Sequence, residues 1–137
     1  TKYFFDGKIY KVRNNKHYMN EFDIWFKKAE QELDTAKYNI KGDKLPAGFF
    51  FLQQSAEKAL KALYIKKFGK LIKTHDLVLL AKDLKAPKNI EEFCMLLTPA
   101  YNYTRYPDII VAVNLKSKAE SFIKSTEEIL EWIKKNI

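Results

Sequence analysis

The sequence contains a single cysteine, Cys94, and no apolar run approaching the roughly 20 residues that a helix needs to cross a bilayer. A lone cysteine cannot form an internal disulfide, and the setting "EEFCMLL" predicts a small, inert core residue. The N-terminus also lacks the uninterrupted apolar core of a signal peptide. We therefore expect a cytoplasmic protein without an internal disulfide or a membrane-spanning helix.

Motifs for metals and nucleotide phosphates are missing as well. The two histidines, His17 and His75, are far apart in the chain, and neither HExxH nor paired CxxC occurs. The four glycines are scattered singly, which excludes a P-loop and a GxGxxG fingerprint. We expect no metal and no cofactor.

What the chain does contain is enough apolar surface for one core. Of 137 residues, 47% are hydrophobic and 31% charged, which excludes a disordered chain and fits a single domain. The net charge of +8 is concentrated in two stretches, residues 1–20 at +4 and residues 57–73 at +5. Such a distribution suits a phosphate-bearing or acidic partner, although lysine clusters are also common on ordinary solvated surfaces.

From Met19 onward, apolar residues recur at helical spacing. The pattern predicts three long helices, over about 19–40, from Pro46 to near Gly69, and from Leu115 to the end. Two short helices are expected between them, over 74–84 and 89–97, with Thr74 as an N-cap and Asn89 with Glu92 as a capping box. The result is an all-α, antiparallel up-and-down bundle of four to five helices.

The first 18 residues have a different pattern. Aromatic and β-branched residues flank "DG" and later "NN", as in a hairpin. We expect residues 1–18 to form a short β-ribbon or an extended arm, and residues 19–137 to form the helical domain. The run Phe49–Phe50–Phe51 at the start of the second long helix exceeds what one core needs, so a homodimer is expected to cover the rest.

Two groups of polar residues are candidates for a functional site. The first lies in "FFLQQSAEKALKAL" and the following "THDL": Gln53 and Glu57 share one helix face, and the other members lie nearby, namely Gln54, Lys58, Lys61, His75 and Asp76. Glu57 and Lys61 form an i,i+4 pair. The alternative is that the glutamines and lysines are solvated, and that His75 and Asp76 only stabilise a helix start.

The second group is in "AYNYTRYPDI", residues 100–109. Arg105 can grip a phosphate with two hydrogen bonds, and the faces of Tyr103 and Tyr106 can stack on a base. The alternative is that Arg105 pairs with Asp108 or a glutamate and simply pins a loop.

The segments "FFLQQSAEKALKALYIKKFG", "THDLVLLAKDL" and "YNYTRYPD" together resemble the HEPN domain family, the higher eukaryotes and prokaryotes nucleotide-binding domains. The resemblance covers about residues 20–135. It implies an all-α bundle, usually dimeric and often encoded beside a minimal nucleotidyltransferase in toxin and antitoxin pairs. We expect Arg105, Lys58 and Lys61 to contact phosphate, Tyr103 and Tyr106 to stack or line the pocket, and His75 with Asp76 to orient polar groups. The remaining candidates for nucleotide or phosphate binding are Asp108, Gln54 and Glu57.

Some members of that family are metal-independent ribonucleases, recognised by an arginine and a histidine with four to six residues between them. Arg105 matches the arginine, but Ile110, Val111 and Ala112 occupy the histidine positions and cannot transfer a proton. We expect a domain that binds a nucleotide, RNA or a nucleotidyltransferase partner. The alternatives are a ribonuclease that uses Arg105 with His75, and a purely structural dimerisation or interaction module.

Overall fold

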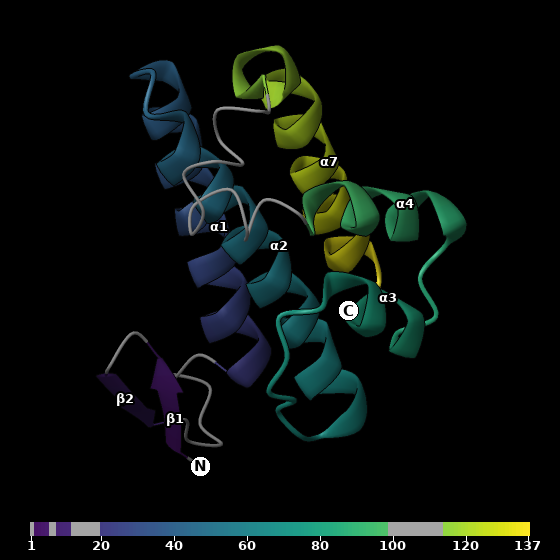
Figure 1. Ribbon diagram of the computed structural model, residues 1–137. Helices are drawn as coiled ribbons and strands as arrows, with labels where there is room; N and C mark the ends of the chain where they lie inside the picture. Colours follow the sequence, from purple (N-terminus) through teal and green to yellow (C-terminus); the bar gives the residue numbers. More distant parts are fainter. Residues whose placement is uncertain (1, 6–7, 12–19, 99–113) are drawn as a thin grey trace.

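The computed structural model describes residues 2–5, 8–11, 20–98 and 114–137. In these ranges the chain forms two strands and five helices: β1 (Lys2–Phe5), β2 (Lys8–Lys11), α1 (Glu21–Lys41), α2 (Leu45–Phe68), α3 (Leu77–Asp83), α4 (Lys88–Leu97) and α7 (Leu115–Lys135). Figure 1 shows the three long helices packed together, with α3 and α4 beside them.

Helix α1 begins where its sequence provides a cap. The side chain of Asn20 accepts a hydrogen bond from the backbone N–H of Asp23 at 2.8 Å, and Glu21 and Asp23 place negative charge in the first turn. The predicted apolar stripe faces the core: Trp25 is 7% exposed and Ala29 is fully buried. The helix predicted over 19–40 is confirmed.

Helix α2 is the centre of the domain. Pro46 lies in its first turn, and Gly69 ends it with a left-handed φ of 69°, both as predicted. Near its start, Gly48 faces α1 so closely that a β-carbon there would collide with Ile40. Between residues 52 and 65, every side chain except those of Gln54 and Lys58 is buried. The helix is therefore covered on nearly all sides.

The two short helices lie where the sequence predicts them, but their caps differ. The N-cap of α3 is Asp76, which accepts from the N–H of Leu79 at 3.1 Å; Thr74 instead accepts from the N–H of Asp76. The N-cap of α4 is Pro87, without a side-chain hydrogen bond, so the expected box of Asn89 and Glu92 is wrong. The chain enters α4 through the extended conformation that proline favours.

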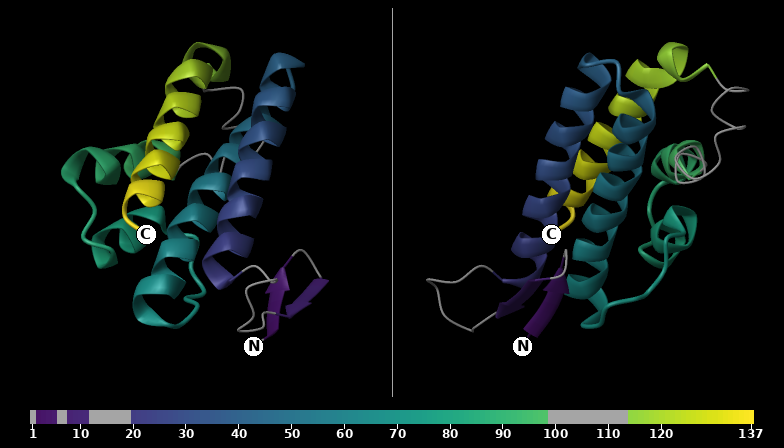
Figure 2. Two further views of the ribbon diagram at one scale, coloured as in Figure 1. Left: turned by 180° about the vertical axis from the view of Figure 1, so that it is seen from behind. Right: turned by 60° about the vertical axis from the view of Figure 1, so that its left-hand side comes forward.

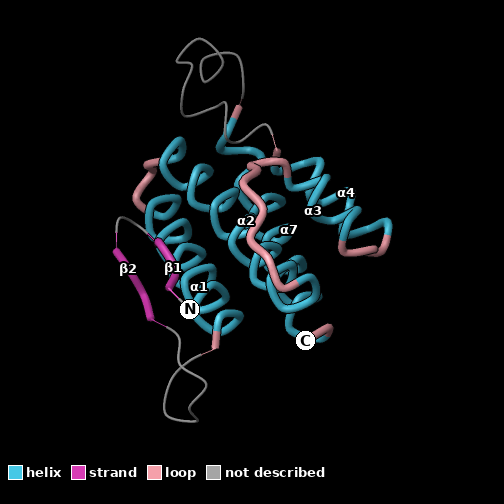
Figure 3. Tube along the Cα trace, turned by 90° about the horizontal axis from the view of Figure 1, so that it is seen from below, coloured by secondary structure: helices cyan, strands magenta, loops and turns pink. Residues whose placement is uncertain are grey.

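Helix α7 completes the core by packing mainly against α2 and α4, with a smaller contact to α1 (Figure 2). Phe122, in the first half of α7, stacks on Phe49, near the start of α2, with ring centroids 4.8 Å apart. Lys37, late in α1, pairs with Glu127 of α7, and Glu30, in the middle of α1, pairs with Lys134 near the end of α7. These pairs show that α7 runs parallel to α2 and antiparallel to α1. Figure 3 shows the long helices from below.

The N-terminal strands form the expected ribbon. β1 and β2 pair antiparallel, with Phe5 opposite Lys8 and Lys2 opposite Lys11. In the sequence, only Asp6 and Gly7 separate the two strands, which is the connection that the hairpin pattern predicts.

The all-α bundle is confirmed. No helix in the described ranges is long and apolar enough to span a membrane. The division at residue 18 and the expected homodimer stay predictions. Phe49, one of the three phenylalanines that motivated the dimer, is fully buried within the chain itself.

The stacked rings of Phe49 and Phe122 provide a test of the core. We expect Phe122→Ala to lower the free energy of unfolding by about 3–5 kcal/mol, because it leaves a cavity between α2 and α7. Tyr38→Ala is the matched control, since Tyr38 is 81% exposed and should change stability by no more than about 0.5 kcal/mol. Urea unfolding followed by circular dichroism measures both. Equal effects of the two substitutions would contradict this assignment of the core.

Candidate functional site

The first polar group of the sequence forms a connected network around Glu57. This residue is 4% exposed in the middle of α2. Lys61 donates to its Oε2 at 3.1 Å, and Gln53 donates to its Oε1 at 3.3 Å. Gln54 in turn donates to the side-chain carbonyl of Gln53 at 2.7 Å. Glu57 is a buried charge that is satisfied in part by neighbours on its own helix.

His75 joins the same carboxylate from outside the helix. Its Nδ1 lies 2.9 Å from Oε1 of Glu57, although the two residues are 18 positions apart. The imidazole side chain is 61% exposed while the glutamate beneath it is buried. Asp76 holds the segment in place because it caps α3 directly after His75. The fold thus places an exposed imidazole in contact with a buried carboxylate.

Lys58 points to the other side of α2, toward α1. Its ammonium forms an ion pair with Glu32, and both side chains are almost fully covered, at 11% and 9% exposure. The sequence interpretation did not include Glu32. A signal was present, because Glu32 follows Ala29 by three residues and so interrupts the buried face of α1 with a charge.

The alternative that these glutamines and lysines are solvated is wrong for Gln53 and Lys61, whereas Gln54 and Lys58 are partly buried. Its second half is confirmed for Asp76, which caps the start of α3. Gln53 is fully buried and Lys61 is 7% exposed. Of the six lysines in residues 57–73, Lys58 and Lys61 are neutralised by carboxylates. The basic character of this stretch therefore comes from the exposed lysines further along, Lys66, Lys67, Lys70 and Lys73.

The arrangement has a definite chemical capability. When Nδ1 of His75 carries its proton, it donates to Glu57, and the carboxylate then fixes the orientation of the ring. An imidazole held in this way can donate to a phosphate oxygen or exchange a proton with a bound ligand. In the described residues, no three or more His, Cys, Asp and Glu side chains are placed to hold a metal ion.

The second group of candidate residues lies outside the described part of the chain. Tyr103, Arg105, Tyr106 and Asp108 all fall within residues 99–113. Their roles stay predictions. The segment "IIVAV" also lies there, and α7 begins after it, with Asn114 as its N-cap.

Cys94 is fully buried in α4, as its apolar setting predicts. Burial, followed by the negative charges of Glu91 and Asp76, raises the pKa of its thiol to about 12. A thiol that stays protonated and covered is a poor nucleophile. The structure supports the interpretation of Cys94 as a core residue.

The fold and the polar network define a helical-bundle domain with a buried charge network on its central helix. The model of the HEPN domain family matches residues 22–137. The chain belongs to the HEPN domain family.

Solved structures agree with that membership. The crystal structure of TT1696 from Thermus thermophilus superposes with a TM-score of 0.76 at 25% identity, covering 87% of this chain and 100% of that one. The crystal structure of ST0689, described as an archaeal HEPN homologue, gives a TM-score of 0.70 at 28% identity over 86% of this chain and 98% of that one. No sequence among the curated proteins matches significantly.

The Glu57 network predicts a strong coupling between Glu57 and Lys61. We expect Glu57→Gln to destabilise the fold by about 3 kcal/mol, because the buried ammonium of Lys61 loses its carboxylate. Adding Lys61→Met should recover most of that loss, because no uncompensated charge then remains. Urea unfolding of the two single variants and the double variant measures this coupling. If the double variant loses as much stability as the two single variants lose together, the pair is not coupled.

Burial of Cys94 predicts slow alkylation in the native state. At pH 8, well below its pKa of about 12, we expect iodoacetamide to modify Cys94 only as fast as the domain unfolds. Mass spectrometry over time follows the modification, and the urea-unfolded protein provides the fully reactive control. Native labelling at the unfolded rate would contradict the inert assignment.

Proposed function

We propose that this HEPN domain binds RNA through its phosphates, with His75 as one contact and Arg105 as another. The observation that carries the proposal is the placement of His75, whose exposed ring is held 2.9 Å from the buried carboxylate of Glu57. Burying a carboxylate is costly, and here it fixes the direction of a surface imidazole. An imidazole fixed in direction can bind a phosphate oxygen with little loss of side-chain entropy.

In this proposal the lysines of α2 have different roles. Lys61 and Gln53 hold Glu57, and Lys58 ties α2 to α1 through Glu32, so these residues build the support for the site. Arg105 supplies the bidentate phosphate contact, as its match to the family's arginine implies. Tyr103 and Tyr106 supply stacking faces for bases, and Asp108 orients the arginine.

Anisotropy of a fluorescein-labelled single-stranded RNA tests the proposal. We expect Arg105→Ala and His75→Ala each to weaken binding about tenfold, because each removes a charge-assisted hydrogen bond. Affinity should also fall steeply with salt. Lys27→Ala, at an exposed position on α1, removes the same charge as Arg105→Ala and should change affinity less than about twofold. Affinity insensitive to Arg105, His75 and salt would overturn the proposal.

A second candidate function is metal-independent RNA cleavage, and the pairing of His75 with Glu57 favours it. Attack of a ribose 2′-hydroxyl on its phosphate needs a base, and an imidazole held by a carboxylate has that capability. The anisotropy experiment separates the two functions when the RNA is recovered and examined on a gel in the presence of EDTA. Intact RNA supports binding alone, whereas cleavage that is lost in His75→Gln assigns the second function.

The proposed assembly is a homodimer, with a minimal nucleotidyltransferase as the partner in a toxin and antitoxin pair. Apolar side chains exposed on α3 and α4 support an interface there, since Leu79, Met95 and Leu96 are 40%, 54% and 38% exposed. If the interface is the whole function, the Arg105→Ala variant still binds the partner, and the wild-type protein does not bind RNA.

A further inference from the structure

Helix α2 leaves the core abruptly at its C-terminal end. Residues 61–65 are all buried, whereas residues 66–71 are all exposed. Gly69 ends the helix in the left-handed region, and a β-carbon there would meet nothing within 4 Å beyond its chain neighbours. Figures 1 and 2 show this turn at one end of the helical bundle, with the connection from α1 to α2 at the other end. The turn after α2 therefore projects into solvent.

Two apolar side chains are exposed at this turn. Phe68, the last residue of α2, is 42% exposed, and Leu71 is 44% exposed. The ring of Phe68 packs against that of Tyr64, with centroids 4.6 Å apart. After the helix, exposed and partly buried residues alternate, and Ile72 packs on the core between exposed neighbours. The fold thus holds Phe68 and Leu71 at the surface instead of covering them.

The apolar side chains of this turn lie among exposed lysines. Four of them fall within eight residues of sequence, namely Lys66, Lys67, Lys70 and Lys73. Among the described residues, no carboxylate pairs with any of the four. The ammonium of Lys67 lies 5.7 Å from the ring centre of Phe68, so charge and apolar surface are in direct contact. The turn combines positive charge with exposed apolar surface.

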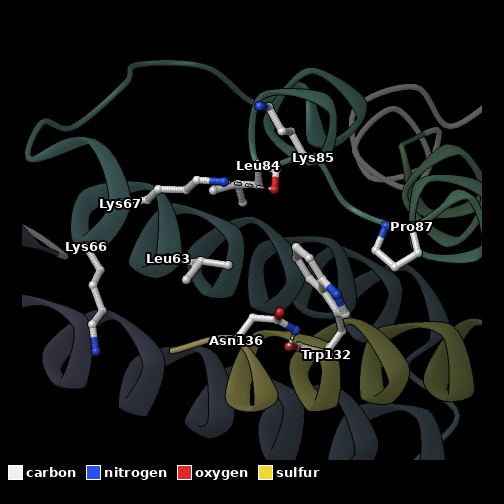
Figure 4. A pocket seen from close by; sticks show the side chains of 8 residues that line it. All are labelled: Leu63, Lys66, Lys67, Leu84, Lys85, Pro87, Trp132 and Asn136. Carbon is white, nitrogen blue, oxygen red and sulfur yellow. Dashed lines mark hydrogen bonds between the residues drawn. The ribbon is translucent and has the colours of Figure 1, made fainter.

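Two of these lysines also line a groove beside α2. Lys66 and Lys67 border a hollow of about 680 Å³ together with Lys85, just after α3, and Trp132 of α7 (Figure 4). Lys67 donates to the backbone carbonyl of Leu84 at 3.4 Å, which joins the end of α2 to the end of α3. In the described part of the chain, no carboxylate lines this groove. The basic surface therefore extends from the turn after α2 to Lys85.

We propose that this end of the domain binds the surface of a bilayer that contains anionic phospholipids. Phe68 and Leu71 insert among the headgroups, and the surrounding lysines contact the negative groups of the lipids. Charge complementarity identifies the occupant, because cations that no described carboxylate neutralises share one short segment with exposed apolar side chains. An anionic bilayer satisfies both, since its charge lies at the surface and its apolar chains lie directly beneath.

Leu71 is the residue that favours a lipid surface over RNA. Bases can stack on the ring of Phe68, and phosphates can pair with the lysines. A phosphate backbone, however, offers no apolar contact to an aliphatic side chain. In the described ranges no helix is long and apolar enough to span a membrane, so the proposed contact is peripheral. A few lysines and two apolar side chains give binding that is weak and reversible.

Co-sedimentation of the full chain with lipid vesicles tests the proposal. One set of vesicles contains only phosphatidylcholine, and the other also contains about 30% phosphatidylserine to supply negative charge. We expect binding to the anionic vesicles and at least about tenfold weaker binding to the neutral ones. Raising the salt concentration should weaken the anionic binding, because salt screens the lysines.

A charge variant and its matched control locate the contact. Lys70→Ala combined with Lys73→Ala should weaken binding about thirtyfold, since each lysine near an anionic surface contributes about fivefold. Lys41→Ala combined with Lys44→Ala removes the same charge from exposed positions at the connection between α1 and α2. This control should keep the affinity within about twofold. Urea unfolding verifies that both proteins are folded.

A second pair of variants separates insertion from attraction between charges. Leu71→Ser should weaken vesicle binding about fivefold, because the apolar contact is lost, whereas Tyr38→Ser, at an exposed position late in α1, should not. A nitrobenzoxadiazole label on Leu71→Cys should brighten when anionic vesicles are added, and the same label on Tyr38→Cys should not. Cys94 is buried and stays unlabelled in the native protein.

The proposal is overturned if neutral vesicles bind as well as anionic ones, or if neither kind binds. It also fails if the control pair of lysines matters as much as Lys70 and Lys73. If Leu71→Ser keeps full affinity and the label at position 71 does not respond, the turn attracts polyanions in general. RNA would then be the better candidate for these lysines, and the lipid surface would be excluded.

Discussion

A charge buried on a central helix has to be paired within the protein, and in this domain that requirement organises the site. Helix α2 is enclosed by α1, α3 and α7, yet it carries Glu57, Lys58 and Lys61 in its covered middle. Glu57 pairs with Lys61 of its own helix and with His75 of the segment before α3. Lys58 forms an ion pair with Glu32 of α1. The pairing of Lys58 with Glu32 connects α2 to α1, and the contact of His75 with Glu57 fixes a side chain at the surface.

The same requirement separates two kinds of basic residue. Lysines in the enclosed part of α2 are neutralised by carboxylates and stabilise the fold. Lysines past residue 65, where α2 emerges from the core, are exposed, and two of them border the groove next to Trp132. The net charge of residues 57–73 is therefore unevenly distributed. A ligand would meet little of it near Glu57, and it is concentrated at the groove.

His75 and the groove beside Trp132 are separate features, since His75 is not among the residues that line the groove. His75 is positioned by a carboxylate under it, whereas Lys85 is positioned by a left-handed backbone. Burial of a carboxylate and a left-handed φ at a lysine each cost stability.

Periodicity was sufficient for the helices. The stripes in α1, α2 and α7, the proline and glycine at the ends of α2, and the two-residue hairpin connection all follow from local rules that act within a few residues. The family could also be recognised from local segments, because "QQSAEKALKAL" and "THDL" stand close in the chain. The pairing of Glu57 with Lys61 is local as well, since four residues make about one helical turn.

Contacts between distant residues were decided only by the tertiary structure. The bonds from His75 to Glu57 and from Lys58 to Glu32 join positions 18 and 26 residues apart. The parallel direction of α7 and α2 and the groove at their ends depend on how whole helices pack. Charge and hydropathy along the sequence determine which faces must be buried. They do not determine which neighbour covers each face, because that depends on packing among all the helices at once.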